Sequence, residues 1–579
     1  MKRLLIYLKD YKLQCIMAPL FKMLEALFEL FVPLVMASII DDGISLGNKG
    51  VIWSKGAVLL ALAFIGLVCS VTAQYFSAKA ATQFSRGLRS DLFKHIKSLS
   101  YADVDGLGTS TLITRLTSDT NQIQNGVNMV LRLLLRSPFV VFGAMIMAFT
   151  IDVKSALIFV VAIPLLAIVV VGITVITLPM YRKVQSHLDG VTGKTRENLN
   201  GVRVIRAFNK EADELDEFNV QNDALSNLQL VTGRISALSN PLTFIIVNAA
   251  TITLIYSGAI RVDAGVITQG EVVALVNYMS QILVELIKFT NLIVTITKAL
   301  ACANRVADIL DIKPSIESGS DKMGSDLKTQ GLDICFDNVS FKYNGASEES
   351  LSNVNINIKA GQTIGIIGST GSGKSSLVQL IPRFYDITSG SLKIGGKEVA
   401  DIDIEMLRKD IGFVHQKSIL FKGSIRDNIR FGNEDATDEE IWEALRVAQA
   451  ESFVKEKEGG LDYEIAQGGR NLSGGQKQRL TIARAVVRHP RILILDDSAS
   501  ALDYMTDSAL RQEIAKLDNS MTILIVSQRT SSIKNADLIV VLDDGQIVGQ
   551  GTHDELMKNC DVYQEIYYSQ YEREEASNG

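Results

Sequence analysis

A glycine-rich segment at residues 368–375 has the residue types and spacing of a phosphate-binding loop. Its sequence, Gly-Ser-Thr-Gly-Ser-Gly-Lys-Ser, fits the pattern GxxxxGK[ST] and stands between a β-rich run at 362–368 and a helical pattern at 376–384. That strand, loop and helix order is the context such a match requires. Backbone N–H groups would bind a β-phosphate, the lysine would reach the β/γ oxygens, and the serine hydroxyl would hold Mg²⁺. The candidate ATP-binding residues here are Gly368, Ser369, Thr370, Gly371, Ser372, Gly373, Lys374, Ser375 and Ser376.

An aspartate that ends an apolar strand pattern is a candidate for the same site. Residues 492–495 are Ile-Leu-Ile-Leu, and Asp496 follows them. The carboxyl end of a strand in an open α/β domain is where a Mg²⁺-ordering acid belongs. This signal is weak alone and strong beside the loop at 368–375, so Ser375 and Asp496 are expected to hold Mg²⁺ with ATP.

A second anion cradle is predicted at residues 472–476, Leu-Ser-Gly-Gly-Gln. A Ser-Gly-Gly turn that opens a helix offers free backbone N–H groups, a hydroxyl and the positive end of the helix dipole. The loop at 368–375 already supplies such groups to this chain's own nucleotide. The second cradle is therefore expected to serve a nucleotide bound to another copy of the domain.

The composition of the 579-residue chain divides it into a membrane half and a soluble half. The hydrophobic content is 47% and the mean hydropathy +0.20, yet 21% of residues are charged, so the two properties must be segregated. We expect a transmembrane domain at 1–300, a linker at 301–330, a nucleotide-binding domain at 331–570 and a tail at 571–579. The net charge of −6 gives no sign of a nucleic-acid partner, and the five scattered cysteines indicate neither zinc nor a disulfide framework.

Six apolar stretches are long enough to cross a bilayer, which takes roughly 20 helical residues. Basic residues precede the first stretch and crowd the connections after the second and fourth, whereas the opposite loops are short and nearly free of positive charge. The positive-inside rule then puts both termini and the nucleotide-binding domain in the cytoplasm, and the expected location of the spans is the plasma membrane. The stretches are about 14–40, 56–78, 133–151, 155–180, 238–260 and 271–297.

The two long cytoplasmic connections are rich in helix formers and are predicted to be helical extensions of the spans. They are expected to turn at 103–110 and 208–218, where they could contact the soluble domain.

Polar residues share faces in the first and last spans. A charge facing lipid costs several kcal/mol, so these faces should point into the bundle or a water-filled cavity. One interpretation is a substrate cavity that favours cationic cargo; the other is a polar contact between helices near the cytoplasmic end. The candidate cavity residues are Glu25, Glu29, Asn277, Gln281 and Glu285, accompanied by Lys22 and Lys288 on the same faces.

With these motifs in this order, the soluble half resembles the nucleotide-binding domain of ATP-binding cassette (ABC) proteins, and the whole chain resembles an exporter half-transporter. The resemblance implies an all-α six-helix transmembrane domain followed by an α/β P-loop domain with a helical subdomain. It also implies that two such domains enclose two ATP molecules head to tail. It makes Tyr343 the aromatic that stacks on adenine and Gln416 the glutamine that contacts Mg²⁺ and the attacking water. The signature motif is then Leu472, Ser473, Gly474, Gly475 and Gln476, and Ser500 and Asp503 belong to the D-loop that crosses the dimer.

The chain departs from the family pattern at its catalytic positions. Asp497 stands where the family has a glutamate that polarises water, and Gln528 replaces a histidine. The shorter acid withdraws its carboxylate by more than about an ångström, which can cost about a hundredfold in rate, and an amide cannot shuttle a proton. Gln467 also replaces a frequent glutamate just before the signature. The resemblance therefore implies a site that binds MgATP well and hydrolyses it poorly.

Such asymmetry is typical of heterodimeric exporters, in which a paralogous half-transporter carries the competent site. The expected function is ATP hydrolysis coupled to efflux of small lipophilic compounds, with multidrug efflux as the default and cationic cargo favoured by the acidic spans. A nucleotide-gated sensing or regulatory membrane complex is the alternative from another class, and lipid or peptide export stays open. A soluble P-loop ATPase is excluded by the six spans.

Overall fold

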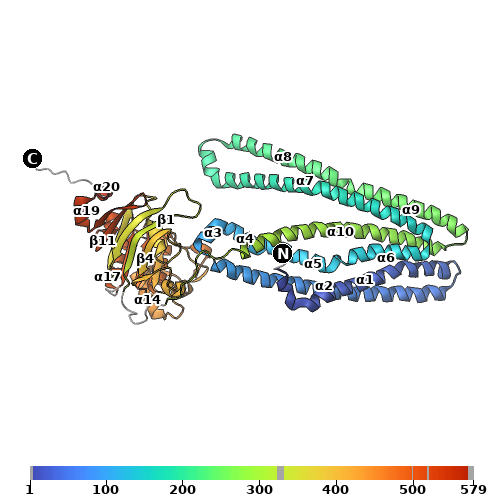
Figure 1. Ribbon diagram of the computed structural model, residues 1–579, viewed down its shortest axis with the longest axis horizontal. Helices are drawn as coiled ribbons and strands as arrows, with labels where there is room; N and C mark the ends of the chain where they lie inside the picture. Colours follow the sequence, from blue (N-terminus) through green and yellow to red (C-terminus); the bar gives the residue numbers. More distant parts are fainter. Residues whose placement is uncertain (1–3, 322–330, 499, 518–520, 572–579) are drawn as a thin grey trace, which may run out of the picture. The chain divides into compact units, whose positions relative to one another are not determined.

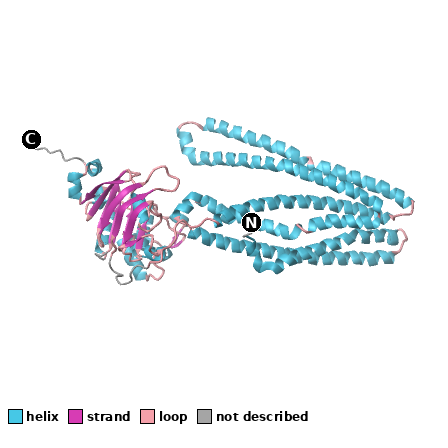
Figure 2. Ribbon diagram, viewed as in Figure 1, coloured by secondary structure: helices cyan, strands magenta, loops and turns pink. Residues whose placement is uncertain are grey.

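The computed structural model describes residues 4–321, 331–498, 500–517 and 521–571. By its contacts the chain forms two units: Met1–Lys97 with Ser110–Ile312, and Ser98–Thr109 with Lys313–Gly579. The first is helical and the second combines helices with sheets (Figure 2). Parts of the expected linker (322–330) and tail (572–579) lie outside the described residues.

Six segments of the first unit, counted over the described residues, are long and apolar enough to span a membrane, as predicted. Several contain more than one element because short 3-10 or π turns interrupt the α-helices. The elements are η1 (Leu4–Tyr11), α1 (Lys12–Ser38), η2 (Ile39–Ile44), α2 (Lys49–Ser98), α4 (Thr109–Thr114), η3 (Arg115–Asp119), α5 (Thr120–Leu133), α6 (Arg136–Ile151), α7 (Val153–Ala207), α8 (Glu211–Ala237), α9 (Ser239–Asp263) and α10 (Gln269–Leu310).

The long arms are helical, as predicted for the cytoplasmic connections: α2 and α7 are single helices, whereas the other arms are divided into consecutive elements, α4 to α6 and α8 with α9. The 55 residues of α7 correspond to about 80 Å of helix at 1.5 Å per residue. Figure 1 shows α7 and α8 side by side.

The turn predicted at 208–218 is shorter than expected. Helix α7 ends at Ala207, Asn209 takes a positive φ of 53°, and α8 already begins at Glu211. The acidic residues that suggested a loop form the first turn of α8, where negative charge favours the positive end of the helix dipole. That first turn contains Glu211, Asp213 and Glu214.

The second unit is built on a six-stranded sheet in the order β12-β11-β3-β10-β9-β6, in which only β12 is antiparallel to its neighbour. Because β3 and β9 both flank β10 in parallel, their carboxyl ends meet at one edge of the sheet. The strands are β3 (Thr363–Gly368), β6 (Ile411–Val414), β9 (Ile492–Asp496), β10 (Thr522–Val526), β11 (Leu538–Asp543) and β12 (Gln546–Gly551).

An antiparallel sheet, β2-β1-β4-β5, and a short β7-β8 pair complete the strands of the described residues. Apolar residues of both larger sheets and of the helix after β3 form one core, and a second core lies among helices α13 to α16, the predicted helical subdomain. The strands are β1 (Ile334–Phe341), β2 (Leu351–Ile358), β4 (Ser389–Ile394), β5 (Lys397–Glu398), β7 (Gly423–Ser424) and β8 (Glu464–Ile465). The helical elements are α3 (Tyr101–Leu107), α11 (Lys374–Leu380), α12 (Ile404–Lys409), α13 (Ile425–Arg430), α14 (Asp438–Val447), α15 (Glu451–Glu456), η4 (Gly460–Asp462), η5 (Gln467–Gly469), α16 (Gly474–Val486), α17 (Tyr504–Lys516), α18 (Thr530–Ile533), α19 (His553–Asn559) and α20 (Asp561–Gln570).

The segment Ser98–Thr109 belongs to the second unit by its contacts. In it, the ring of Tyr101 lies 4.7 Å from that of Phe384, and Asp105 accepts a hydrogen bond of 2.8 Å from the Tyr385 hydroxyl. The predicted contact with the soluble domain is therefore confirmed, although residues 101–107 form the short helix α3, which Gly108, with a φ of 76°, separates from α4.

Candidate functional site

The loop that follows β3 is shaped by glycines in the left-handed region. Gly371 has a φ of 89° and Gly373 a φ of 91°, conformations that a residue with a Cβ adopts at a cost. A Cβ on Gly373 would also lie 2.6 Å from the carbonyl oxygen of Ser350. Because Gly373 is the N-cap of α11, the loop presents backbone N–H groups and a helix N-terminus to the same space.

Lys374 lies inside this loop. Its Nζ donates hydrogen bonds to the carbonyl oxygens of Gly368 (2.9 Å) and Ser369 (2.6 Å). Burial lowers the pKa of its ammonium, while the negative charges of Asp497 and Asp496 oppose that shift. The arrangement places a cation where phosphate oxygens would take over from backbone carbonyls.

Ser375 and Asp496 meet where the ends of β3 and β9 converge. The Ser375 hydroxyl donates to Asp496 Oδ1 at 2.9 Å, and Asp496 is buried. Burial raises the pKa of Asp496, Asp497 raises it further, and the Ser375 hydrogen bond and Lys374 lower it. A hydroxyl and a carboxylate in contact form a hard-oxygen donor set of the kind that Mg²⁺ prefers, so these residues fit the predicted metal.

Asp497 follows directly with a φ of 44°, and its N–H donates to the Val526 carbonyl at 3.0 Å. Gln416 Nε2 donates to its Oδ2 at 3.1 Å. Burial raises the pKa of Asp497, against the lowering effects of Gln416, Lys374 and Arg529. The carboxylate at the predicted catalytic position is thus held by the side-chain amide of Gln416.

One cavity of about 780 Å³ is lined by most of the residues predicted to bind or hydrolyse ATP, although Gly368, Ser369, Ser372 and Asp496 are not among its lining residues. Tyr343 stands on its wall, with its hydroxyl 3.0 Å from Ser376 Oγ and its ring 4.7 Å from that of Phe341. The predicted residues that line it are Tyr343, Thr370, Gly371, Gly373, Lys374, Ser375, Ser376, Gln416, Asp497 and Gln528. The cavity is of a size typical for small-molecule sites.

The signature motif does not join this cavity. Ser473 is the N-cap of α16: its Oγ accepts from Gln476 N at 3.3 Å, and Gln476 Oε1 accepts from Ser473 N at 3.1 Å. A Cβ on Gly474 would meet no heavy atom within 4 Å, so the N-terminus of α16 is open beside it. Among the described residues that line the cavity there is none from 472–476, and neither Ser500 nor Asp503 is among them.

The D-loop residues are held by local hydrogen bonds. Ser500 Oγ donates to the Asp497 carbonyl at 2.8 Å, and Asp503 caps α17 by accepting from Thr506 N at 3.1 Å. Ser500 therefore connects this loop directly to the residue at the predicted catalytic position.

The motifs did not identify the acidic wall of the cavity. Glu348, Glu349 and Asp544 line it, and Glu349 accepts a hydrogen bond of 2.7 Å from Ser352 Oγ. The acid-rich stretch after Tyr343 was the available sequence signal, but it has no fixed spacing to a motif.

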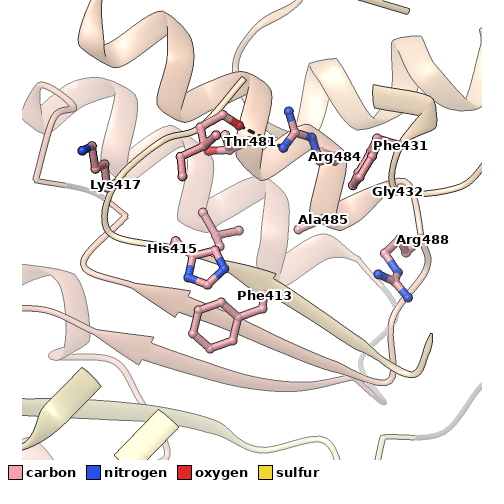
Figure 3. A pocket seen from close by; sticks show the side chains of 11 residues that line it. Phe413, His415, Lys417, Phe431, Gly432, Thr481, Arg484, Ala485 and Arg488 are labelled. Atoms are coloured by element: carbon pink, nitrogen blue, oxygen red, sulfur yellow. Dashed lines mark hydrogen bonds between the residues drawn. The ribbon is translucent and has the colours of Figure 1, made fainter. Parts of the chain in front are cut away.

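A second pocket, of about 210 Å³, is lined in part by the sequence neighbours of Gln416 (Figure 3). Figure 3 shows Phe413 and His415 on one side and Thr481, Arg484 and Ala485 of α16 on the other. Burial lowers the pKa of His415 below its usual range and that of Arg484 to about 10. The segment that contains Gln416 therefore contributes to two cavities, since Gln416 lines the first and its neighbours His415 and Lys417 line the second.

The polar residues of the spans also lie together. Glu29, Asn277, Gln281 and Glu285 line a cavity of about 460 Å³, and Glu25 and Glu29 line a neighbouring one of about 540 Å³. The sequence did not single out Arg136, whose guanidinium contacts both Glu29 and Glu285.

Comparisons with known proteins match both units. The ABC transporter transmembrane region matches residues 15–286, and the ABC transporter ATPase family matches residues 351–500. An uncharacterized ABC transporter ATP-binding protein of Mycobacterium tuberculosis is 37% identical over 568 residues, covering 97% of each chain.

Two further relatives have more specific names. The ATP-dependent lipid A-core flippase of Desulfotalea psychrophila is 34% identical over 513 residues, 89% of each chain. A putative multidrug export ATP-binding/permease protein of Bacillus subtilis is 32% identical over 574 residues, 98% of each chain.

Proposed function

The chain belongs to the ABC transporter family, as an exporter with its transmembrane and ATPase domains in one polypeptide, and on that premise we propose that it is the weakly hydrolysing subunit of a heterodimeric exporter. The family couples ATP hydrolysis to transport across a membrane. In this proposal the chain's own site keeps MgATP bound for a long time and hydrolyses it slowly. Its signature motif closes over the ATP on the loop of a paralogous partner.

The observation that carries the proposal is the contact between Gln416 and Asp497. A general base must reach the water that attacks the γ-phosphate, directly and in the right direction. The aspartate side chain is one methylene short for this task, and its carboxylate already accepts a hydrogen bond of 3.1 Å from Gln416. Gln528, on the same cavity, has no group that can shuttle a proton.

The groups that hold nucleotide are intact beside this weakened pair. The loop glycines, Lys374, Ser375 and Asp496 provide N–H donors, a cation and hard oxygens. Mg²⁺ bound at Ser375 and Asp496 would neutralise charge on the phosphates. Firm binding with slow turnover follows from this combination.

A partner domain is supported by the open end of α16. Ser473 and Gly474 lie outside their own chain's cavity, and the space beside Gly474 is free. An anion there would have to be carried by another domain. A paralogue with a glutamate and a histidine at the two altered positions would complete the competent site.

The transported compound is proposed to be lipophilic, through efflux of drugs or movement of lipids, with peptides as a further candidate. The relatives named as a lipid A-core flippase and a putative multidrug exporter support this range. The distribution of basic residues supports a cytoplasmic ATPase domain, and the transmembrane domain is proposed to lie in the plasma membrane.

Replacing Asp497 by asparagine tests the asymmetry. The chain is co-purified with its paralogue, and steady-state ATPase of the pair is measured with and without Asp497→Asn. We expect most of the turnover to remain, because the competent site uses the partner's acid. The matched control removes the acid that follows the partner's own apolar strand and should abolish activity. A loss of more than about tenfold from Asp497→Asn would show that this chain's site is the working one.

Removing the Tyr343 ring should weaken MgATP binding about tenfold, since stacking on a base is worth about 1–3 kcal/mol. Tyr343→Phe keeps the ring and loses only the hydrogen bond to Ser376, so it should bind nearly as well as the wild type. Binding of a fluorescent ATP analogue is measured in a pair whose partner loop lysine is substituted, so that only this site is counted. Equal losses in Tyr343→Ala and Tyr343→Phe would assign the effect to the hydroxyl and contradict stacking.

A further inference from the structure

The cavity of about 460 Å³ in the first unit is built by three helices. α1 contributes Glu29, Val32 and Met36, α6 contributes Val140, and α10 contributes a face from Asn277 to Lys288. One part of its wall is apolar and another is charged or polar. Such a cavity matches an amphiphile, whose apolar and polar parts need separate surroundings.

The charges around it cancel. Arg136 is buried and donates through Nη1 to Glu285 and through Nη2 to Glu29 at 2.6 Å. Lys288 Nζ also donates to Glu285, at 2.8 Å, and Lys22 Nζ donates to both oxygens of Glu25. This charge cluster (Lys22, Glu25, Glu29, Arg136, Glu285 and Lys288) therefore has three carboxylates against three cations. It has no net negative charge with which to attract a simple cation.

The cluster nevertheless leaves groups of both signs open to the cavity. Only Oε2 of Glu29 is bound by Arg136, and this side chain is 41% exposed. Lys288 is 44% exposed and has ammonium protons beyond the one given to Glu285. Gln281 lines the same cavity, but its Oε1 is buried and, within the described residues, has no hydrogen-bond partner.

A ligand must satisfy both kinds of group to bind well. An ammonium could be held by the exposed carboxylate of Glu29, and a phosphate or carboxylate by Lys288. A ligand with one charge would bring an uncompensated charge into a neutral cluster surrounded by apolar walls, which is costly. A ligand with both charges keeps the balance.

We propose that this cavity binds a zwitterionic amphiphile, with an ammonium at Glu29 and an anionic group at Lys288, and that this is the substrate class of the exporter. The apolar chain would follow Val32 and Met36 and continue into the neighbouring cavity, which shares Glu29 and Val32 and adds Leu59 and Leu62. The statement that this amphiphile is the transported substrate rests on the proposed export function. The cavity's selectivity itself does not depend on hydrolysis.

The test uses three probes with the same dodecyl chain: dodecylphosphoethanolamine, dodecylamine and dodecyl phosphate. The full chain with its partner is kept in an uncharged maltoside detergent, and bound probe is counted by native mass spectrometry. We expect the zwitterion to bind at least about tenfold more tightly than either singly charged probe. This preference is measured without ATP.

Two variants assign the preference to its residues. Glu29→Gln should abolish the advantage over dodecyl phosphate, and Lys288→Met the advantage over dodecylamine. Both leave the Arg136–Glu285 ion pair in place. Lys298→Met, on the same helix and outside the cavity, is the matched control and should change nothing.

Equal binding of the three probes, no saturable binding of the zwitterion, or a preference for dodecylamine would overturn the proposal. If the preference for the zwitterionic probe survives in both variants, the probe binds elsewhere and the proposal is also overturned. None of these results bears on the asymmetry of the two ATP sites, which the Asp497→Asn experiment tests separately.

Discussion

Replacing Gly474 with alanine is expected to lower the ATPase activity of the assembled pair about a hundredfold while leaving this chain at least as stable. Within the chain, the new Cβ meets no heavy atom within 4 Å and the φ angle is not positive. Alanine is the better helix former, so the gain in stability can reach about 1 kcal/mol. Any loss of activity must therefore come from outside this polypeptide.

The physical reason lies at the N-terminus of α16. Gly474 is the first residue of this helix, and Cβ atoms tilt toward the helix N-terminus, where the partner's phosphates are proposed to lie. Displacing the phosphates by about an ångström is enough for a hundredfold loss.

Steady-state ATPase and thermal unfolding of the same preparation measure the two effects. Gly233→Ala is the matched control, because Gly233 is an exposed residue inside α8 with equal space for a Cβ. It should raise stability similarly and leave turnover unchanged. Full activity in Gly474→Ala would mean that this signature closes over no phosphate.

The order of the sheet explains why part of the site was predictable. The loop at 368–375 and Asp496 each follow a strand, and parallel strands end on one edge, so the contact between Ser375 and Asp496 follows from local patterns. The helical structure of the long arms could likewise be predicted, from the helix-forming composition of the cytoplasmic connections. Their second turn lies at the start of the predicted range 208–218 but is shorter, because the acidic residues that follow it form the first turn of α8.

Contacts between segments far apart in the chain could not be predicted from the sequence. Arg136 meets Glu29 and Glu285 across separations of 107 and 149 residues, and its position near the start of a span gave no sign of either. Gln416 reaches Asp497 across 81 residues. These contacts depend on the tertiary packing of α1, α6 and α10 and on the neighbouring positions of β6 and β9, which no local periodicity encodes.

Restoring the family's residues in Asp497→Glu/Gln528→His is expected to raise hydrolysis at this chain's own site about a hundredfold. The glutamate returns the missing methylene, which moves the carboxylate forward by about an ångström and past the amide of Gln416. The histidine supplies a group that can carry charge and a proton near the γ-phosphate. ATP binding should change little, because Lys374, Ser375 and Asp496 are untouched.

The measurement must separate the two nucleotides of the pair. Photoreactive, radiolabelled ATP is loaded in a single turnover, crosslinked at successive times, and the two chains are resolved on a gel with their ATP-to-ADP ratios. In the wild type, label on this chain should persist as ATP long after the label on the partner has become ADP. In the double variant, the label on this chain should become ADP at a rate close to that of the partner.

Asp497→Asn/Gln528→His is the control that separates the base from the histidine. It has the new imidazole without a carboxylate, and it should stay slow. If the wild-type chain converts its own ATP as fast as the partner does, the short side chain of Asp497 and its contact with Gln416 do not limit hydrolysis. In that case the two sites would be equivalent, and the open end of α16 would be compatible with a second copy of this same chain.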